Sequence, residues 1–287
     1  MTEPNPFLVY SLSGYESTAF RKCMLRVLVS ESELHAAVFD PLGNCFPRVE
    51  RFSLQAGYSG LKNWQLAARI IQYAALFRQP FEQVEWIWNL QPYTLVPDAF
   101  YADENKSDYA RFIAASPNNL VIQAQPVCRG SIQVVYGFPK EWKTVLEECA
   151  LKPQLESHYT HWLLFYAELH LRQNNGVMVH FHDASIDIVV YRDRELQMLN
   201  TFKYQTADEC LYFILLTSEQ YHFDRAKETL HLCGEIDSGS ALFQTIAKYF
   251  ADVLFLNRAS EPATGEPQGE APNMALHYHM NLLHPAL

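Results

Sequence analysis

The chain is short of positive charge and has no long apolar run. Its 22 lysines and arginines stand against 32 aspartates and glutamates, which gives a formal net charge of −10 over 287 residues. Binding to a nucleic-acid backbone needs clustered Lys and Arg side chains, and no such cluster occurs. No apolar stretch approaches the ~18–20 residues that span a bilayer. The sequence therefore predicts neither nucleic-acid binding nor an integral membrane segment.

The sequence predicts no secretory leader and contains no closely spaced pair of cysteines. Residues 1–6 carry Glu3 and two prolines instead of a basic region, and residues 7–12 are too few for the apolar part of a leader. The six cysteines form no CxxC pair, and several fall within strand or helix patterns, where a reduced thiol behaves as a small hydrophobe. We therefore expect a cytoplasmic protein, with an irregular segment at residues 1–21.

Motifs of familiar catalytic sites are missing as well. There is no P-loop, no G-x-G-x-x-G loop and no G-x-S-x-G nucleophile elbow. His180 and His182 share one face of a predicted strand, as two metal ligands would, but the sequence names no third ligand. The preferred interpretation is a polar strand end, so we predict no metal, no cofactor and no catalytic residue. A thiol nucleophile at Cys128 or Cys233 is an alternative to buried structural cysteines.

Two stretches of the chain share one pattern, in which three strand-like runs precede an amphipathic helix. The first has predicted strands at 23–30, 34–40 and 45–54 and a helix at 61–78. The second has predicted strands at 177–182, 186–192 and 195–203 and a helix at 206–221. Thr206 and Glu209 have the spacing of a capping box at the start of that helix. The repeat predicts a two-lobed α/β protein, each lobe a mixed sheet with a β-β-β-α core.

We expect the first lobe at residues 1–158, with an inserted subdomain at about 92–158, and the second lobe at 159–287. A segment rich in Pro, Gly and Glu predicts a mobile loop at about 259–273 in the second lobe. Trp86 and Trp88 share one face of a further predicted strand. Core packing is the expected role of this pair, and a binding platform is the alternative.

The order of elements resembles the actin-like ATPase superfamily, the ribonuclease-H-like fold of actin, hexokinases and Hsp70 chaperones. Residues 94–104, residues 230–236 and the late Leu-His-Tyr-His-Met-Asn-Leu-Leu motif make the resemblance more specific. They resemble an uncharacterised bacterial family of actin-like proteins that carries only a domain-of-unknown-function label. More distantly similar are the actin-like type IV pilus assembly platform protein and the cytoplasmic domain of the type II secretion L component. This resemblance implies a scaffold that grips peptide segments of a partner protein.

Members of the superfamily that hydrolyse ATP carry an Asp followed closely by Gly in the first hairpin of each lobe, where phosphates and Mg²⁺ bind. Here the first hairpin has Glu31 and Glu33 but no glycine, and in the second His180 and His182 take the Asp and Gly positions. The resemblance implies a degenerate nucleotide cleft, with these candidate binding residues: Ser30, Ser32, Asp183, Ser185, Asp187 and Gly234.

The preferred hypothesis is a catalytically inactive actin-like protein that binds a protein or peptide partner. A sheet edge or the interlobe cleft would provide the binding surface, and a homodimer is compatible with the sequence. One alternative is a divergent nucleotide-binding ATPase or kinase that uses Asp40, Asp183 or Asp187. Another is a small-ligand sensor that binds its ligand in the same cleft without turnover.

Overall fold

The computed structural model describes residues 7–13, 20–42, 45–55, 60–89, 91–114, 116–148, 154–170, 175–256 and Leu282. These residues divide into two units, with unit 1 within 1–164 plus Leu282 and unit 2 within 165–256. The division falls inside helix α4 (His158–His170). In the described part of the chain, no helix is long and apolar enough to cross a membrane. The predicted loop at 259–273 lies outside the described residues.

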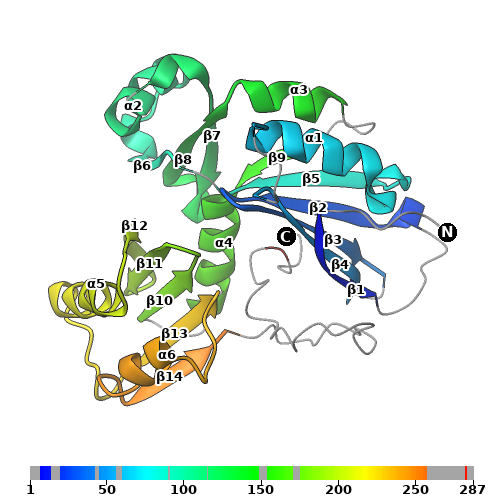
Figure 1. The fold of residues 1–287 in the computed structure, drawn as a ribbon. Coiled ribbons are helices and arrows are strands. Elements are labelled where there is room, and N and C mark those ends of the chain that lie inside the picture. Colours follow the sequence, from blue (N-terminus) through cyan, green and yellow to red (C-terminus); the bar gives the residue numbers. More distant parts are fainter. Residues whose placement is uncertain are drawn as a thin grey trace. The chain divides into compact units, whose positions relative to one another are not determined.

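Unit 1 contains a six-stranded mixed sheet in the spatial order β1-β4-β3-β2-β5-β9 (Figure 1). Its strands are β1 (Leu8–Ser13), β2 (Met24–Val29), β3 (Glu33–Asp40), β4 (Cys45–Ser53), β5 (Gln83–Trp88) and β9 (Gln154–Ser157). The predicted first meander is confirmed, because β2, β3 and β4 pair antiparallel in sequence order. Strands β2 and β5 pair in parallel and are buried along almost their whole length, which explains their nearly continuous apolar runs.

Strand β1 shows that the prediction of an irregular segment at residues 1–21 was wrong. The strand pairs antiparallel with β4, with Ser13 opposite Arg48. Its sequence, Leu-Val-Tyr-Ser-Leu-Ser, shows no strict alternation, and Leu8 and Val9 are exposed. Residues 8–13 therefore form a strand mainly because they pair with the edge of β4 and less because of their own sequence pattern.

The predicted helix at 61–78 ends earlier than expected. Helix α1 spans Asn63–Tyr73, after which Ala74 is extended with φ −71° and ψ 127°. A 3₁₀ turn (Ala75–Arg78) follows and buries Leu76 completely. Because Gln79 precedes a proline, the α conformation is disfavoured there, which helps to end the helical segment.

A three-stranded antiparallel sheet in the order β6-β8-β7 also belongs to unit 1. Its strands are β6 (Tyr93–Pro97), β7 (Leu120–Val127) and β8 (Ile132–Pro139), and the accompanying helices are α2 (Lys106–Ile113) and α3 (Glu141–Glu148). Trp88 of β5 packs against Phe138 of β8 and Trp142 of α3, with ring centroids 5.2 and 5.0 Å apart. Trp86 and Trp88 are both buried. Core packing of this pair is thus confirmed.

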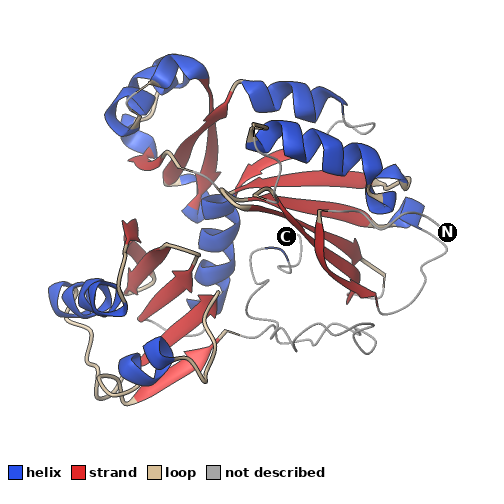
Figure 2. Ribbon diagram, viewed as in Figure 1, coloured by secondary structure: helices blue, strands red, loops and turns tan. Residues whose placement is uncertain are grey.

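Unit 2 is built on a five-stranded sheet in the order β12-β11-β10-β13-β14, labelled in Figure 1 and drawn in red in Figure 2. Its elements are β10 (Gly176–Phe181), β11 (Ser185–Arg192), β12 (Glu195–Lys203), α5 (Ala207–Gln220), β13 (Thr229–Gly234), α6 (Ala241–Ile246) and β14 (Asp252–Phe255). The second predicted meander and its helix are confirmed. The Thr206 side chain caps α5 by accepting a hydrogen bond from the Glu209 N–H at 3.2 Å.

Gly234 ends β13 in a conformation that only glycine tolerates there. Its φ is +84°, and a Cβ at this position would lie 2.2 Å from the carbonyl oxygen of Phe181. Gly130 has nearly the same φ, +83°, but nothing lies within 4 Å of the position of its missing Cβ. The two glycines therefore share the backbone requirement, and only Gly234 has the steric one.

We predict that Gly234→Ala lowers the free energy of unfolding of unit 2 by more than Gly130→Ala lowers that of unit 1. The positive φ alone costs an L-residue about 1–3 kcal/mol, and the contact with Phe181 adds to this cost only at Gly234. Denaturant unfolding measures both losses, and each variant is compared on the transition of its own unit. Equal losses would show that the backbone around Gly234 moves aside without further cost.

Candidate functional site

The candidate site of unit 2 lies on the face of the sheet opposite its hydrophobic core cluster. Phe181 and Ile186 belong to that cluster, and successive side chains of a strand point to opposite faces. His180 lies directly opposite Asp187 in the pairing of β10 with β11. Asp187 in turn lies opposite Thr201 of β12. The register therefore aligns one hydroxyl, one carboxyl and one imidazole on the same face.

Polar contacts connect this row to His182, which follows β10. Nε2 of His182 is 2.6 Å from Oδ2 of Asp187 and 3.1 Å from Nδ1 of His180. The Thr201 hydroxyl donates to Oδ1 of Asp187 at 2.5 Å. Asp187 is fully buried and His180 is 2% exposed, whereas the His182 side chain is 19% exposed. Two imidazoles and one carboxylate thus meet near the surface, a donor set that can share protons or hold a metal ion.

The other predicted residues of the second hairpin lie near this row. Asp183 is exposed in the turn, and Ser185 begins β11, where its carbonyl accepts the His182 N–H at 2.9 Å. Gly234 lies at the end of the neighbouring strand, against Phe181 and the ring of His180. Its missing side chain accommodates that close approach. The glycine is therefore explained without a phosphate.

Ser30 and Ser32 lie in the turn between β2 and β3 in unit 1. The Ser30 hydroxyl accepts the Glu33 N–H at 3.1 Å, and the Ser30 N–H donates to the Glu33 carbonyl at 2.9 Å. The Glu33 carboxylate is 2.8 Å from His35 and 2.5 Å from Arg51. Burial raises the pKa of Glu33, but its contacts with His35 and Arg51 outweigh burial and hold this pKa below the usual range.

These hairpins do not fit the phosphate groups of a nucleotide. A phosphate cradle needs backbone N–H groups that point at the anion and bare positions that let it approach. In the first hairpin the N–H groups of Ser30 and Glu33 are bonded within the turn, beside a charged carboxylate. In the second, the His182 N–H is bonded to the Ser185 carbonyl within the turn. We therefore derive no chemistry from a bound triphosphate.

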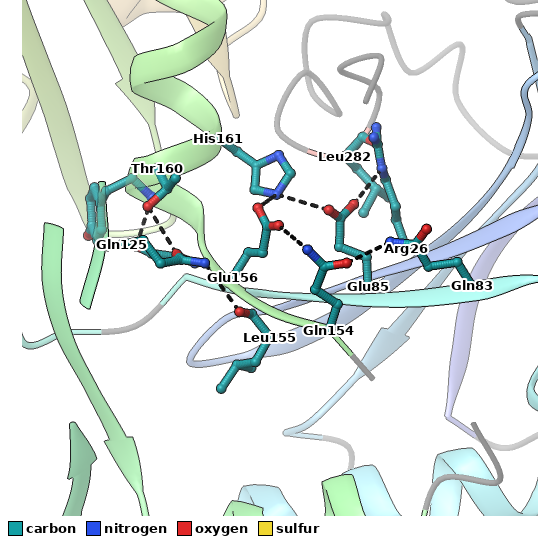
Figure 3. Close-up of polar contacts among 12 residues, drawn as sticks. Arg26, Gln83, Glu85, Gln125, Gln154, Leu155, Glu156, Thr160, His161 and Leu282 are labelled. Carbon is teal, nitrogen blue, oxygen red and sulfur yellow. Dashed lines mark hydrogen bonds and ion pairs between the residues drawn. The ribbon is translucent and has the colours of Figure 1, made fainter. Parts of the chain in front are cut away.

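A second polar cluster lies in unit 1, around Glu85 of β5 (Figure 3). Arg26 of β2 is fully buried, and its Nε donates to the Glu85 carboxylate at 2.7 Å. Nε2 of His161 is 3.4 Å from Glu85 and 2.7 Å from Glu156, contacts that are ion pairs rather than directed hydrogen bonds. Nη1 of the Arg26 guanidinium also donates to the Leu282 carbonyl at 3.3 Å.

The charges of this cluster balance when His161 is protonated. Burial alone would lower the pKa of His161, but Glu156 and Glu85 together outweigh burial and raise it to about 9. For Glu85, burial acts to raise the pKa, and contacts with His161 and Arg26 lower it below the usual range. The cluster was not predicted. The signal available was one charged residue in the middle of each of two apolar strand sequences, Met-Leu-Arg-Val-Leu-Val and Gln-Val-Glu-Trp-Ile-Trp.

This pKa predicts how the stability of unit 1 depends on pH. Because folding raises the pKa of His161 from its usual 6.5 to about 9, its contribution is complete below pH 6.5 and is lost as the pH rises through 9. We expect a loss of about 1–3 kcal/mol over that range, measured by denaturant unfolding at a series of pH values. His161→Gln should flatten this part of the profile, and the exposed-site control His222→Asn should leave it unchanged. A wild-type slope that survives His161→Gln would assign the pH dependence to other groups.

Comparisons with solved structures establish the fold. A Bacteroides thetaiotaomicron protein described as having an actin-like ATPase fold and unknown function superposes with a TM-score of 0.73 at 14% identity, covering 84% of this chain and 93% of that one. A chain of the PilM–PilN type IV pilus biogenesis complex superposes with a TM-score of 0.54 at 13% identity, covering 83% of this chain and 89% of that one. The predicted actin-like fold is thereby confirmed.

No protein in the curated set matches the chain. A family model described as "Protein of unknown function (DUF3822)" matches residues 15–253. This range includes both meanders and both polar clusters. The chain therefore belongs to the DUF3822 family.

Proposed function

We propose that the protein is a catalytically silent, cytoplasmic actin-like scaffold that binds an extended segment of a partner protein along the edge strand β12. The observation that carries this proposal is the composition of that edge. Between the charged residues at its two ends, Glu195 and Lys203, the strand has no charged residue, no proline and no glycine over residues 196–202. An edge strand without such residues readily accepts another strand, because its outward backbone groups can complete a new ladder.

The other edge strands of the described sheets carry features that discourage strand addition. These features are a bulge between Leu8 and Tyr10 in β1, Pro97 in β6, Pro126 in β7, Glu156 in the short strand β9, and Asp252 in the short strand β14. Strand β12 has one irregularity near its start, after which Met198–Lys203 pairs in regular register with β11. Strand β12 thus carries its protective features, Glu195, Lys203 and the bulge at Gln197, only toward its ends, and its middle is uncharged.

Side chains of β12 satisfy some of its own backbone groups. The Thr201 N–H donates to Oδ1 of Asn200 at 2.9 Å, and the Gln197 amide donates to the Glu195 carbonyl at 3.5 Å. Asn200 and Gln197 are exposed, so a partner strand can displace these local bonds at small cost. Nearby on α5, Tyr212 and Leu216 are exposed one helical turn apart and offer apolar surface for alternate side chains of the partner.

The catalytically silent half of the proposal is supported by the two hairpins, because the N–H groups of Ser30, Glu33 and His182 are bonded within the turns and acidic or imidazole side chains lie beside them. The binding half is supported by the occurrence of the same fold in the PilM–PilN type IV pilus biogenesis complex. That neighbour shows the fold in a protein complex. The edge proposed here follows from the residues of this chain.

We expect a photo-crosslinking amino acid at Gln197 to capture one stoichiometric protein in the cells that naturally produce the chain. The same group at Gln244, which is also an exposed glutamine and lies on α6, should not capture it. Asn200→Lys should weaken the complex about tenfold or more, because an edge lysine opposes strand addition, whereas Asn200→Gln should retain it. Capture of a second copy of the chain would show that the partner is another copy of this protein and that the complex is a homodimer. No specific product from Gln197, or equal capture from both sites, would contradict the proposal.

We also expect no saturable binding of Mg-ATP at millimolar concentration by calorimetry, and no ATP hydrolysis above background. The physical reason is that the N–H groups of Ser30, Glu33 and His182 are already bonded within the turns. Saturable binding with turnover would instead support the divergent ATPase or kinase, with Asp40, Asp183 or Asp187 as the carboxylates to test by substitution to Asn.

A further inference from the structure

The strongest unexplained feature of unit 2 is the convergence of three ligand atoms from His180, His182 and Asp187. We propose that these residues form a binding site for a divalent transition-metal ion of the Zn²⁺ type. This metal site does not depend on the proposed scaffold role, because its three ligands come from β10, from the residue after β10 and from β11, and not from the edge strand β12. The sequence alone disfavoured a metal here because it named no third ligand. The register of β10 with β11 supplies that ligand, because it places Asp187 opposite His180.

The distances between the ligand atoms suit one ion. Nδ1 of His180, Nε2 of His182 and Oδ2 of Asp187 are separated by 3.1, 2.6 and 3.9 Å. A triangle with these sides has a centre about 2 Å from all three corners, which is the length of Zn–N and Zn–O bonds. An ion at or slightly above that centre reaches every donor without moving the backbone. Two imidazoles and one carboxylate are a common ligand set of zinc and non-haem iron sites.

Hydrogen bonds alone cannot satisfy all the close contacts among these three side chains. Nε2 of His182 faces both Nδ1 of His180 and Oδ2 of Asp187 at hydrogen-bond distance. A ring nitrogen carries either one proton or one lone pair, so a single N–H of His182 cannot point at both neighbours. A cation at the common centre accepts a lone pair from all three atoms. It also balances the charge of Asp187, which is fully buried.

The surroundings hold the ligands in place as a second shell does. The Thr201 hydroxyl donates to the other oxygen of Asp187 at 2.5 Å, which orients the carboxylate with Oδ2 toward the histidines. The ring of His180 is confined by Gly234 of the adjacent strand. The His182 side chain is 19% exposed, so an ion can enter from that side.

The cluster of Glu85, Glu156 and His161 in unit 1 provides an internal contrast. Its donor atoms also lie close together, but Arg26 already occupies one side of Glu85 at 2.7 Å. The raised pKa of His161 gives this cluster a second cation of its own. Two carboxylates facing a guanidinium and an imidazolium are neutral as a group, so no metal is required there.

The test is a titration of chelator-treated, full-length protein with Co²⁺, followed by its visible absorption, and then competition with Zn²⁺. We expect one ion per chain and a rise in the thermal midpoint of unit 2 with Zn²⁺. His182→Gln should weaken binding beyond the ~10–100-fold that loss of a second-shell contact produces, and Thr201→Val should weaken it about tenfold. The matched controls His222→Asn in unit 2 and His161→Gln in unit 1 should bind as the wild type does.

A second measurement keeps the test decisive if His182→Gln fails to fold. X-ray absorption at the metal edge of the Zn²⁺-loaded wild type should show two imidazole ligands and one oxygen ligand at about 2.0–2.2 Å. The proposal is overturned by no stoichiometric binding, by a site without imidazole, or by affinity that is unchanged in folded His182→Gln and Asp187→Asn variants.

Discussion

The antiparallel pairing of β10 with β11 is the constraint on which the candidate chemistry depends. It places His180 opposite Asp187, and the further pairing of β11 with β12 adds Thr201 to the same row. Because side chains alternate across a strand, a shift of one residue would move the carboxylate into the apolar face beside Phe181. That face consists of residues of the hydrophobic core cluster. The cost of burying Asp187 there fixes the register, and the register brings the three ligand atoms together.

The two meanders were predictable because each combines apolar runs with strong turn chemistry, and the Thr206 cap was predictable from its spacing to Glu209. Strand β1 was not, since its partner β4 defines it and its own sequence does not alternate. Only part of each polar cluster could be seen in the sequence alone. His180 and His182 show their common face in the sequence, but Asp187 becomes their neighbour only once the strands pair, and the same holds for Arg26 and Glu85 on β2 and β5.

Gly234 shows that a glycine predicted to border a nucleotide cleft can be required by strand packing alone. A glycine at the end of a strand can leave room for a ligand. In this chain the space beside it is filled by the Phe181 carbonyl and the His180 ring. The glycine therefore serves the packing of β13 on β10, and it also limits where the first metal-binding imidazole can lie.

Thr201 belongs both to the edge strand β12 and to the support of Asp187 through its hydroxyl. A polypeptide added along β12 would alter the position of that hydroxyl, and an ion held by Asp187 would in turn stiffen the strand that receives the polypeptide. Thermodynamic linkage requires that the metal ion change the affinity for the polypeptide by the same factor by which the polypeptide changes the affinity for the metal ion. With both proposed occupants bound, this one threonine would make the metal ion and the protein partner heterotropic effectors of each other.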